Sequence, residues 1–457
     1  MGSDDAPAPH VKENTPTSGL RDTAVTFASR IASMLLGLVW AFALAGLLGP
    51  DRRGSYAVCM QYAGLLTVIF MLGADVGSLY FVASRKMSPS EGAMALLVCS
   101  LAGSVVAIGV GYFLMQTGWE YFRKANPTSF YLALASIPIG FYSGALVYFL
   151  TALREFVWFG IFAVGQVLLS ILLLLVYVWV LGLGVNGAML VLITVNGCTL
   201  AAVWSMLRRK HNLRWMWPTG RGLRQVMGFG VRYYFGKVGN IVNFQLGTLL
   251  LAFSTKTTEA EIGFFAFGLT LVEGVLFLPD TLTIVLSPRV FVDPKGRVEL
   301  VTQCNRIVTV LCGAALVVGA LLAPPFFALF VPEYLPAVVL VWILVPGVWS
   351  RSASKLFVPY LQSQNRVGIA SVAVVAGGVL NLTVLLILLP VIGLPAAALG
   401  VVGNHVVVTA VLAAAFHRCS GQGVWASWRP RRSDWGLLWG ALASLRSRAA
   451  AEGPAKI

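Results

Sequence analysis

The chain has 457 residues, of which 58% are hydrophobic and only 11% charged, and its mean hydropathy is +0.82. A water-soluble protein of this length needs more charged surface than that. The composition therefore excludes an ordinary soluble protein and indicates an all-α membrane protein with many spans. The net charge of +15 predicts no nucleic-acid partner here, because lysine and arginine gather in the cytoplasmic loops of such proteins.

The apolar segments set the number of spans. A helix needs roughly 20 apolar residues to cross a bilayer, and the chain holds about twelve such segments joined by short connections. The expected spans are 22–49, 54–81, 92–117, 128–153, 157–182, 186–208, 224–253, 260–288, 298–323, 336–361, 367–390 and 394–417.

The basic residues orient these spans. Of the 33 lysines and arginines, 22 fall on the side of the N-terminus, 5 on the opposite side and 6 within spans. Positively charged loops remain in the cytoplasm, so we expect both termini there.

Short patterns recur at a nearly constant offset and predict two halves. The turn Gly54–Ala57 after the first span resembles Gly263–Ala266 after the seventh, and Arg154 and Arg366 open corresponding turns. A duplicated six-helix unit gives parallel repeats with a substrate site between them. We therefore expect two pseudo-symmetric six-helix bundles around a central cavity. The expected parts are a disordered cytoplasmic tail (1–20), the first bundle (21–210), a cytoplasmic linker (211–223), the second bundle (224–418) and an amphipathic cytoplasmic tail at the membrane surface (419–457).

Sequence signals for metal, cofactor or nucleotide chemistry are absent. The six cysteines form no CxxC pair, the four histidines are scattered, and no GxxxxGK[ST] motif occurs. We therefore expect no metal, no cofactor, no direct use of ATP and no catalytic triad.

Charged residues inside the spans are the candidates for function. The seventh span carries Arg232 and Lys237, and the eighth carries Glu273 and Asp280, which follows the helix-breaking Pro279. Ionised groups at membrane depth are costly and usually face a wet cavity or one another. On the tenth span, Arg351 and Lys355 are four residues apart, which puts them on one face of a continuous helix.

Several stretches resemble one family. The first hairpin reads ASRIASMLLGLVWAFALAGLLGPDRRGSYAVC, the eighth span closes with VLSPR, and the ninth-to-tenth connection reads LFVPEYLPAVVLVWILVPGVWS. In order and spacing these resemble the Wzx-type polysaccharide flippases of the multidrug/oligosaccharidyl-lipid/polysaccharide (MOP) exporter superfamily. The resemblance covers about Arg21 to Phe416.

The resemblance implies movement of an undecaprenyl-pyrophosphate-linked glycan across the bacterial cytoplasmic membrane, through a central cationic cavity. The expected partners are this lipid-linked glycan, membrane lipids and other membrane proteins of glycan assembly. The Ser29-Arg30 pair also resembles a first-helix arginine of lipid-flippase relatives.

These considerations give the candidate residues. Arginine offers a planar fork for phosphate and lysine a point charge, so cations would bind the pyrophosphate. Acids would bind a coupling proton or pair with the cations; Glu273, for example, could pair with Lys237. The cavity cations are Arg30, Arg232, Lys237, Arg351 and Lys355, and the acids are Asp75, Glu273 and Asp280.

Other functions remain open at this stage. A cation-coupled multidrug efflux transporter of the same superfamily would share the fold. A membrane glycan polymerase or ligase is disfavoured, because the external loops are too short to carry a catalytic domain. A non-transporting scaffold would have no use for charges inside its spans.

Overall fold

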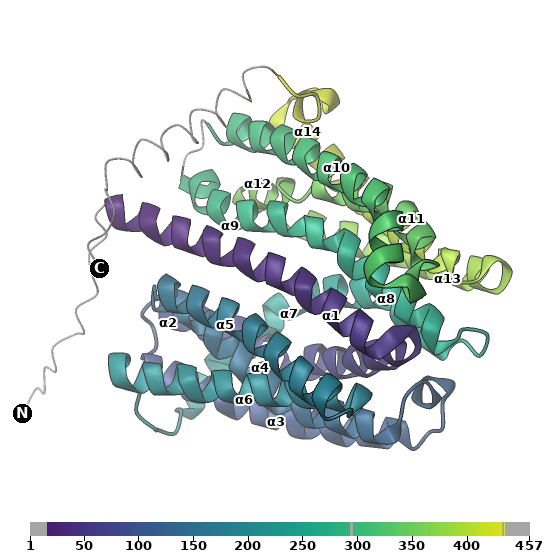
Figure 1. Ribbon diagram of the computed structural model, residues 1–457. Helices are drawn as coiled ribbons and strands as arrows, with labels where there is room; N and C mark the ends of the chain where they lie inside the picture. Colours follow the sequence, from purple (N-terminus) through teal and green to yellow (C-terminus); the bar gives the residue numbers. More distant parts are fainter. Residues whose placement is uncertain (1–15, 293–295, 365, 432–433, 435–457) are drawn as a thin grey trace, which may run out of the picture.

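The computed structural model describes residues 16–292, 296–364, 366–431 and 434, and the regular elements among them are helices (Figure 1). The longer helices are α1 (Pro16–Met71), α2 (Ala74–Ala83), α3 (Pro89–Met115), α4 (Pro127–Ala152), α5 (Phe156–Leu174), α6 (Gly184–His211), α7 (Gly220–Phe253), α8 (Glu259–Glu273), α9 (Phe277–Val292), α10 (Arg297–Phe330), α11 (Ala337–Ser352), α12 (Phe357–Ser363), α13 (Val367–Ile392) and α14 (Pro395–Ser420). Short helices are η1 (Glu120–Arg123), η2 (Leu175–Val180), η3 (Gly274–Leu276), η4 (Pro332–Tyr334) and η5 (Val424–Ser427).

Ten segments of the described chain are long and apolar enough to cross a membrane. The first of them, Ala28–Met71, contains two passes, because the chain reverses at Gly49. There φ is 68°, a left-handed conformation that glycine adopts without steric cost, and Pro50 follows. With α7, which has 34 residues, the part of the chain that the structure describes makes twelve passes. The predicted polytopic all-α fold is confirmed.

The two halves of the chain pack as two groups of helices. One buried cluster joins α2 to α6 and includes Val226 of α7, whereas another joins α9, α10, α12, α13 and α14. In Figure 1 the helices α2 to α6 lie below α1, and α8 to α14 lie above it. A third buried cluster contains residues of both halves. The seam between the halves is therefore part of the hydrophobic core.

Two pairs of passes form this seam. The first limb of α1 packs on α8, where Phe42 meets Phe267 edge to face at 5.3 Å. The second limb of α1 and α2 pack on α7, where the Tyr234 hydroxyl donates to the carbonyl of Ile69 at 2.7 Å. If the second half repeats the first, α7 corresponds to the first limb and α8 to the second. The two contacts are then equivalent by pseudo-twofold symmetry.

Glycines bring the second pair of passes very close. A Cβ on Gly73 would lie 2.6 Å from the carbonyl oxygen of Gly230, and a Cβ on Gly230 would lie 2.6 Å from that of Gly73. Side chains larger than hydrogen are therefore excluded from both positions. Next to them the rings of Tyr80 and Phe229 stack with centroids 4.2 Å apart.

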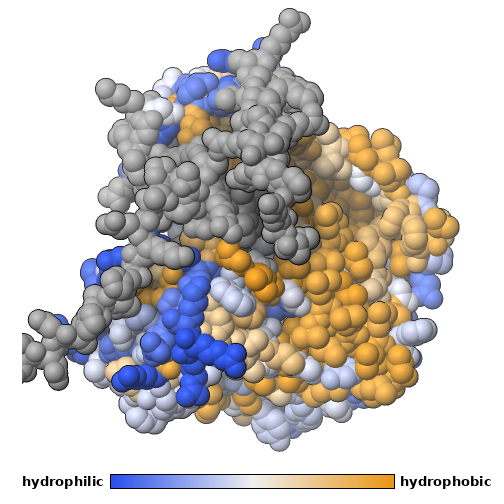
Figure 2. All heavy atoms as spheres, turned by 60° about the vertical axis from the view of Figure 1, so that its left-hand side comes forward, coloured by the Kyte–Doolittle hydropathy of each residue, from blue (hydrophilic) through white to orange (hydrophobic). Residues whose placement is uncertain are grey.

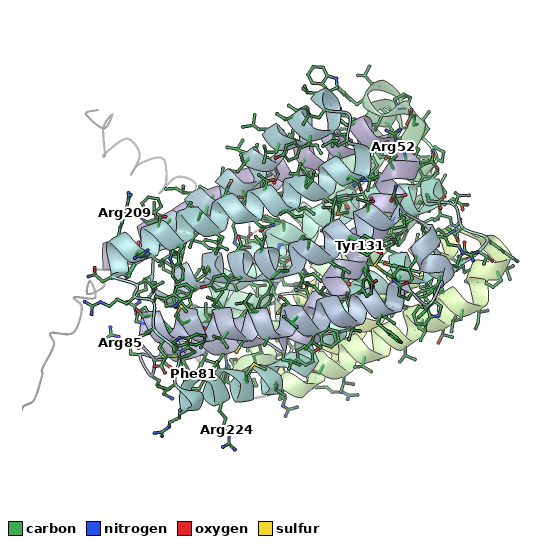
Figure 3. All side chains as sticks on the ribbon, turned by 90° about the horizontal axis from the view of Figure 1, so that it is seen from below. Arg52, Phe81, Arg85, Tyr131, Arg209 and Arg224 are labelled. Carbon is green, nitrogen blue, oxygen red and sulfur yellow. The ribbon has the colours of Figure 1, made fainter. Side chains whose placement is uncertain are left out.

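The bundle has two chemically distinct ends. In Figure 3, Arg85 and Arg209 lie at one end, here called the basic end, whereas Arg52 lies at the other, here called the far end. Figure 2 shows hydrophilic residues gathered at the end turned toward the viewer and a mostly hydrophobic flank beside them. Charged ends with an apolar flank between them are what a bilayer requires of a spanning protein.

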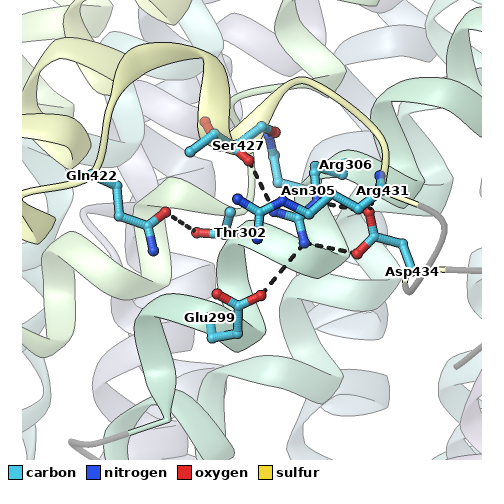
Figure 4. A network of polar contacts seen from close by, with 9 residues as sticks. Glu299, Thr302, Asn305, Arg306, Gln422, Ser427, Arg431 and Asp434 are labelled. Atoms are coloured by element: carbon cyan, nitrogen blue, oxygen red, sulfur yellow. Dashed lines mark hydrogen bonds and ion pairs between the residues drawn. The ribbon is translucent and has the colours of Figure 1, made fainter.

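The segment after α14 is fastened to α10 by a polar network (Figure 4). The guanidinium of Arg306 donates to both carboxylate oxygens of Asp434, at 2.8 and 2.7 Å, and to the carbonyl of Ala426 at 2.9 Å. Asn305 donates to the carbonyl of Ser427 at 3.1 Å. Both Arg306 and Asp434 are only 1% exposed. Residues 435–457, for which the sequence predicts an amphipathic tail, lie outside the described residues.

Candidate functional site

The second half contains two spans whose α-helix is interrupted by a tighter turn at the candidate residues. The eighth pass runs as α8 up to Glu273, turns through η3 and continues as α9, with Asp280 in the first turn of α9. The tenth pass ends α11 at Ser352 and resumes as α12 at Phe357. A tighter turn in the middle of a helix often marks a functional hinge.

The break in the tenth pass separates the two basic candidates. Arg351 lies in the last turn of α11, whereas Lys355 lies in the non-helical turn before α12. The expectation of one continuous helical face for these two residues is therefore not met. The small residues Ser352, at the end of α11, and Ala353 and Ser354, in the turn, lie between them.

Four of the six candidates of the second half, Glu273, Asp280, Arg351 and Lys355, lie close enough to interact electrostatically. The Nζ of Lys355 is 2.6 Å from each carboxylate oxygen of Asp280, and their side chains are 14% and 51% exposed. Arg351 is 8% exposed, and its Nη1 is buried without a hydrogen bond to any described residue. A buried guanidinium nitrogen without a partner has a large desolvation cost that an anion could offset.

Glu273 has a neighbour that the sequence analysis did not single out. The Nε2 of His405, on α14, is 3.7 Å from Oε1 of Glu273, and the histidine side chain is 2% exposed. In the sequence, His405 stands in the apolar run VVGNHVVV of the last span. A polar residue in such a run could have marked it, although its partner 132 positions earlier could not be read from one sequence.

The candidates of the first half are Arg30 and Asp75. The guanidinium carbon of Arg30, on α1, lies 5.8 Å from the ring centroid of Phe159 on α5, within its own half. Asp75 lies in the first turn of α2, just after the left-handed Gly73. Arg232 and Lys237 belong to α7 of the second half, and their side chains lie outside the described residues.

Basic residues at the far end join the two halves. The Nζ of Lys124, next to η1, donates to the carbonyl of Thr257 at 2.6 Å and is buried. The guanidinium carbon of Arg53 lies 5.0 Å from the ring centroid of Phe267, and Gln61 donates to the carbonyl of Gln245 at 2.8 Å. These contacts connect the two halves of the chain toward the far end.

An apolar cavity of about 260 Å³ lies between α1, α8, α10 and α11. Leu38 and Phe42 of α1, Val275 next to α8, and Gly319 and Phe326 of α10 are among its lining residues. Among the residues that the structure describes, no charged side chain lines it, so these residues offer nothing to a phosphate. Among the described residues, no group of three or more His, Cys, Asp or Glu side chains could hold a metal ion.

Comparison with known families identifies the chain. Residues 20–282 match the family described as "Polysaccharide biosynthesis protein", which is more than half of the chain. The chain belongs to this family. Comparison of this chain with curated proteins gave no match.

Solved structures share the fold at low sequence identity. The inward closed conformation of the lipid II flippase MurJ has a TM-score of 0.68 and 13% identity, with 89% of each chain covered. The Vibrio cholerae MATE transporter VcmN in its bent form has a TM-score of 0.58 and 15% identity over 90% of this chain and 100% of that chain. The eukaryotic MATE transporter AtDTX14 has a TM-score of 0.59 and 14% identity over 90% and 97%.

The family and the fold together confirm the predicted membership of the MOP superfamily. They also confirm the expectation of a membrane transporter in place of an enzyme.

Proposed function

We propose that this family member flips a polyprenyl-pyrophosphate-linked oligosaccharide or polysaccharide repeat unit across the bacterial cytoplasmic membrane by alternating access. Two findings support this: the polysaccharide biosynthesis family and a fold shared with a protein named as a lipid II flippase. The proposal makes the lipid-linked glycan and the surrounding membrane lipids its partners, together with other membrane proteins of glycan assembly.

The observation that carries the proposal is the buried Arg351 beside Lys355. Arg351 keeps Nη1 without a hydrogen bond to a described residue, and Lys355 is bound to the half-exposed Asp280. A pyrophosphate could take up the spare guanidinium donor and compete with Asp280 for the ammonium group. Charge-assisted hydrogen bonds of this kind are the strong ones, and arginine matches phosphate geometry. We propose the same role for Arg30, Arg232 and Lys237.

The proposal assigns the two ends of the molecule. Arg85 and Arg209 lie at the basic end (Figure 3), which the positive-inside rule places in the cytoplasm together with both termini. The far end, held by Lys124 on Thr257, then faces the outside and is closed here. The bundles are residues 21–210 and 224–418, with 211–223 as the cytoplasmic linker.

A second candidate function is cation-coupled efflux of small amphipathic compounds. The fold shared with MATE transporters and the acidic Glu273 in the second half favour it. The two functions differ in what accumulates when the protein is absent. A flippase leaves lipid-linked glycan on the inner leaflet, whereas an efflux transporter leaves its drug inside the cell.

The test replaces Arg351 or Lys355 by alanine in cells lacking the native copy. We expect surface glycan to fall at least about tenfold, the effect of losing about 1.4 kcal/mol of binding, while lipid-linked glycan accumulates inside. Lys256→Ala, at an exposed position in the loop before α8, is the matched control and should export normally.

Two outcomes would overturn the proposal. One is normal export by both variants at normal protein levels. The other is normal glycan export in the deletion strain combined with a loss of drug resistance, which would establish the efflux function instead. Arg351→Lys keeps the charge but not the planar fork, so we expect it to restore export only in part.

A further inference from the structure

This inference starts from the buried His405 and its part-buried neighbour Glu273. Nε2 of His405 lies 3.7 Å from Oε1 of Glu273, with side-chain exposures of 2% and 23%. The two residues come from α8 and α14, on either side of α11, which packs against both helices. The distance is that of an ion pair and longer than a hydrogen bond, so a shared proton would require only a small approach.

The titratable groups around this pair come from several helices. Arg351 ends α11, Lys355 follows it, Asp280 begins α9, and Cys312 lies on α10 next to Ser352 and Lys355. The sequence of α13, which also packs on α14, has no charged residue. Helix α7 also packs on α14 and carries Arg232 and Lys237, whose side chains lie outside the described residues.

The charges of the described cluster balance when His405 is neutral. Asp280 and Lys355 form one ion pair at 2.6 Å, and Glu273 and Arg351 carry one charge of each sign. A proton on His405 would therefore give the cluster a net charge of +1. In a buried place that surplus charge is costly unless an anion arrives to balance it.

We propose that Glu273 and His405 form a proton-binding dyad whose proton is taken up together with the anionic head group of the substrate. This inference rests on the proposed function and specifies its coupling ion. The proton comes from water on the side to which the site is open, binds Nε2 of His405, and returns to water after the substrate leaves.

Linkage gives the coupling its direction. A pyrophosphate beside Arg351 and Lys355 favours protonated His405, and by reciprocity the protonated dyad binds the anion more tightly. Glu273 is the positioning residue, because its carboxylate stabilises the imidazolium between binding events. Affinity should then fall as the pH rises, by up to about tenfold per pH unit for one linked proton.

The experiment measures binding of undecaprenyl pyrophosphate to the purified full chain between pH 5.5 and 8.5. Proton uptake on binding is recorded in weak buffer with a pH dye. We expect wild type to bind more weakly at high pH and to take up close to one proton. His405→Gln should lose both the pH dependence and the proton uptake, and Glu273→Gln should weaken both.

The control is a second histidine with a glutamate partner. His211, at the end of α6, lies 3.1 Å from Glu155. We expect His211→Gln to keep the wild-type pH dependence and proton uptake. Each variant is first checked for monodispersity and thermal stability. If His405→Gln fails to fold, the pH dependence and proton uptake are compared between wild type and Glu273→Gln instead.

The outcomes separate the dyad from the proposed function. Wild-type pH dependence and proton uptake in His405→Gln, or pH-independent binding by wild type, would overturn the dyad while leaving the proposed function in place. Absence of binding at every pH would overturn the proposed function, and the dyad with it.

Discussion

Gly54 and Gly263 face each other where the two halves meet at the far end. A Cβ on Gly54 would lie 1.8 Å from the carbonyl oxygen of Glu259, and a Cβ on Gly263 would lie 2.1 Å from that of Pro50. Gly54 and Gly263 are 209 positions apart, as are Pro50 and Glu259. The contact is therefore reciprocal: each repeat presents its glycine to the same backbone position of the other.

The first prediction concerns this contact. Gly54→Ala places a methyl group against backbone that a side-chain movement cannot relieve, so we expect a loss of about 1–3 kcal/mol of stability and impaired transport. Thermal unfolding in detergent measures the first effect. Gly109→Ala is the control, because a Cβ there meets nothing within 4 Å. Equal melting temperatures for the two variants would contradict the close contact.

The second prediction concerns closure of the far end. Lys124→Met removes the hydrogen bond to Thr257, which as a charge-assisted bond is worth about 1.5–3 kcal/mol. We expect the far end to open more often and the buried Cys59 to become accessible. Maleimide labelling of Cys59, in a chain whose other cysteines are alanine, should accelerate by at least about tenfold.

The control for this experiment is Lys256→Met, at an exposed lysine near the same end. It should label at the rate of the parent chain. If both variants label at the parental rate, Lys124 does not hold the far end closed.

The third prediction concerns the Arg306–Asp434 pair. Removing one partner of a buried ion pair leaves a charge without compensation, so Asp434→Asn should cost about 3 kcal/mol. Glu299→Gln is the control, because Glu299 is 57% exposed and only 3.5 Å from Arg306. Thermal unfolding at neutral pH should give Asp434→Asn a clearly lower melting temperature than Glu299→Gln. Similar melting temperatures for the two variants would argue against the buried ion pair.

The same pair gives a pH dependence with a definite sign. Burial raises the pKa of Asp434, but the hydrogen bonds from Arg306 and from the backbone of Arg431, together with the positive charge of Arg306, outweigh it and hold the pKa below its ordinary value. The stabilisation is thus complete above about pH 4 and is lost as the pH falls further. Wild type and Asp434→Asn should therefore converge in stability under strong acid, and a constant difference down to that range would contradict the assignment.

The fourth prediction tests the Lys355–Asp280 bond within the candidate site. Lys355→Asp places two carboxylates together, and we expect glycan export to be lost. Exchanging the charges in the double variant, Lys355→Asp with Asp280→Lys, restores the attraction and should recover protein stability. Glycan export should not recover fully, because the lysine of the double variant lies at position 280 on α9 and not beside Arg351. Full export by the single variant would exclude a role for this pair.

The number of passes and the repeat could be predicted because they depend on local composition. Apolar length alone predicts a span, and the recurrence of Gly54–Ala57 as Gly263–Ala266 indicates duplication without any knowledge of contacts. The charges at membrane depth were equally visible, since Glu273, Asp280, Arg351 and Lys355 stand out in apolar runs. The sequence could not predict the break in the tenth pass, where no proline lies between Arg351 and Lys355.

The pairing of these charges was decided only by tertiary structure. Lys355 binds Asp280 from 75 positions away, Arg306 binds Asp434 from 128, and His405 meets Glu273 across two different helices. Burial makes an unpaired charge costly, so a sequence alone can indicate that such residues need partners. Which partner each residue has depends on how the helices pack. The partners are far apart in the sequence, so the spacing of residues along one helix cannot indicate them.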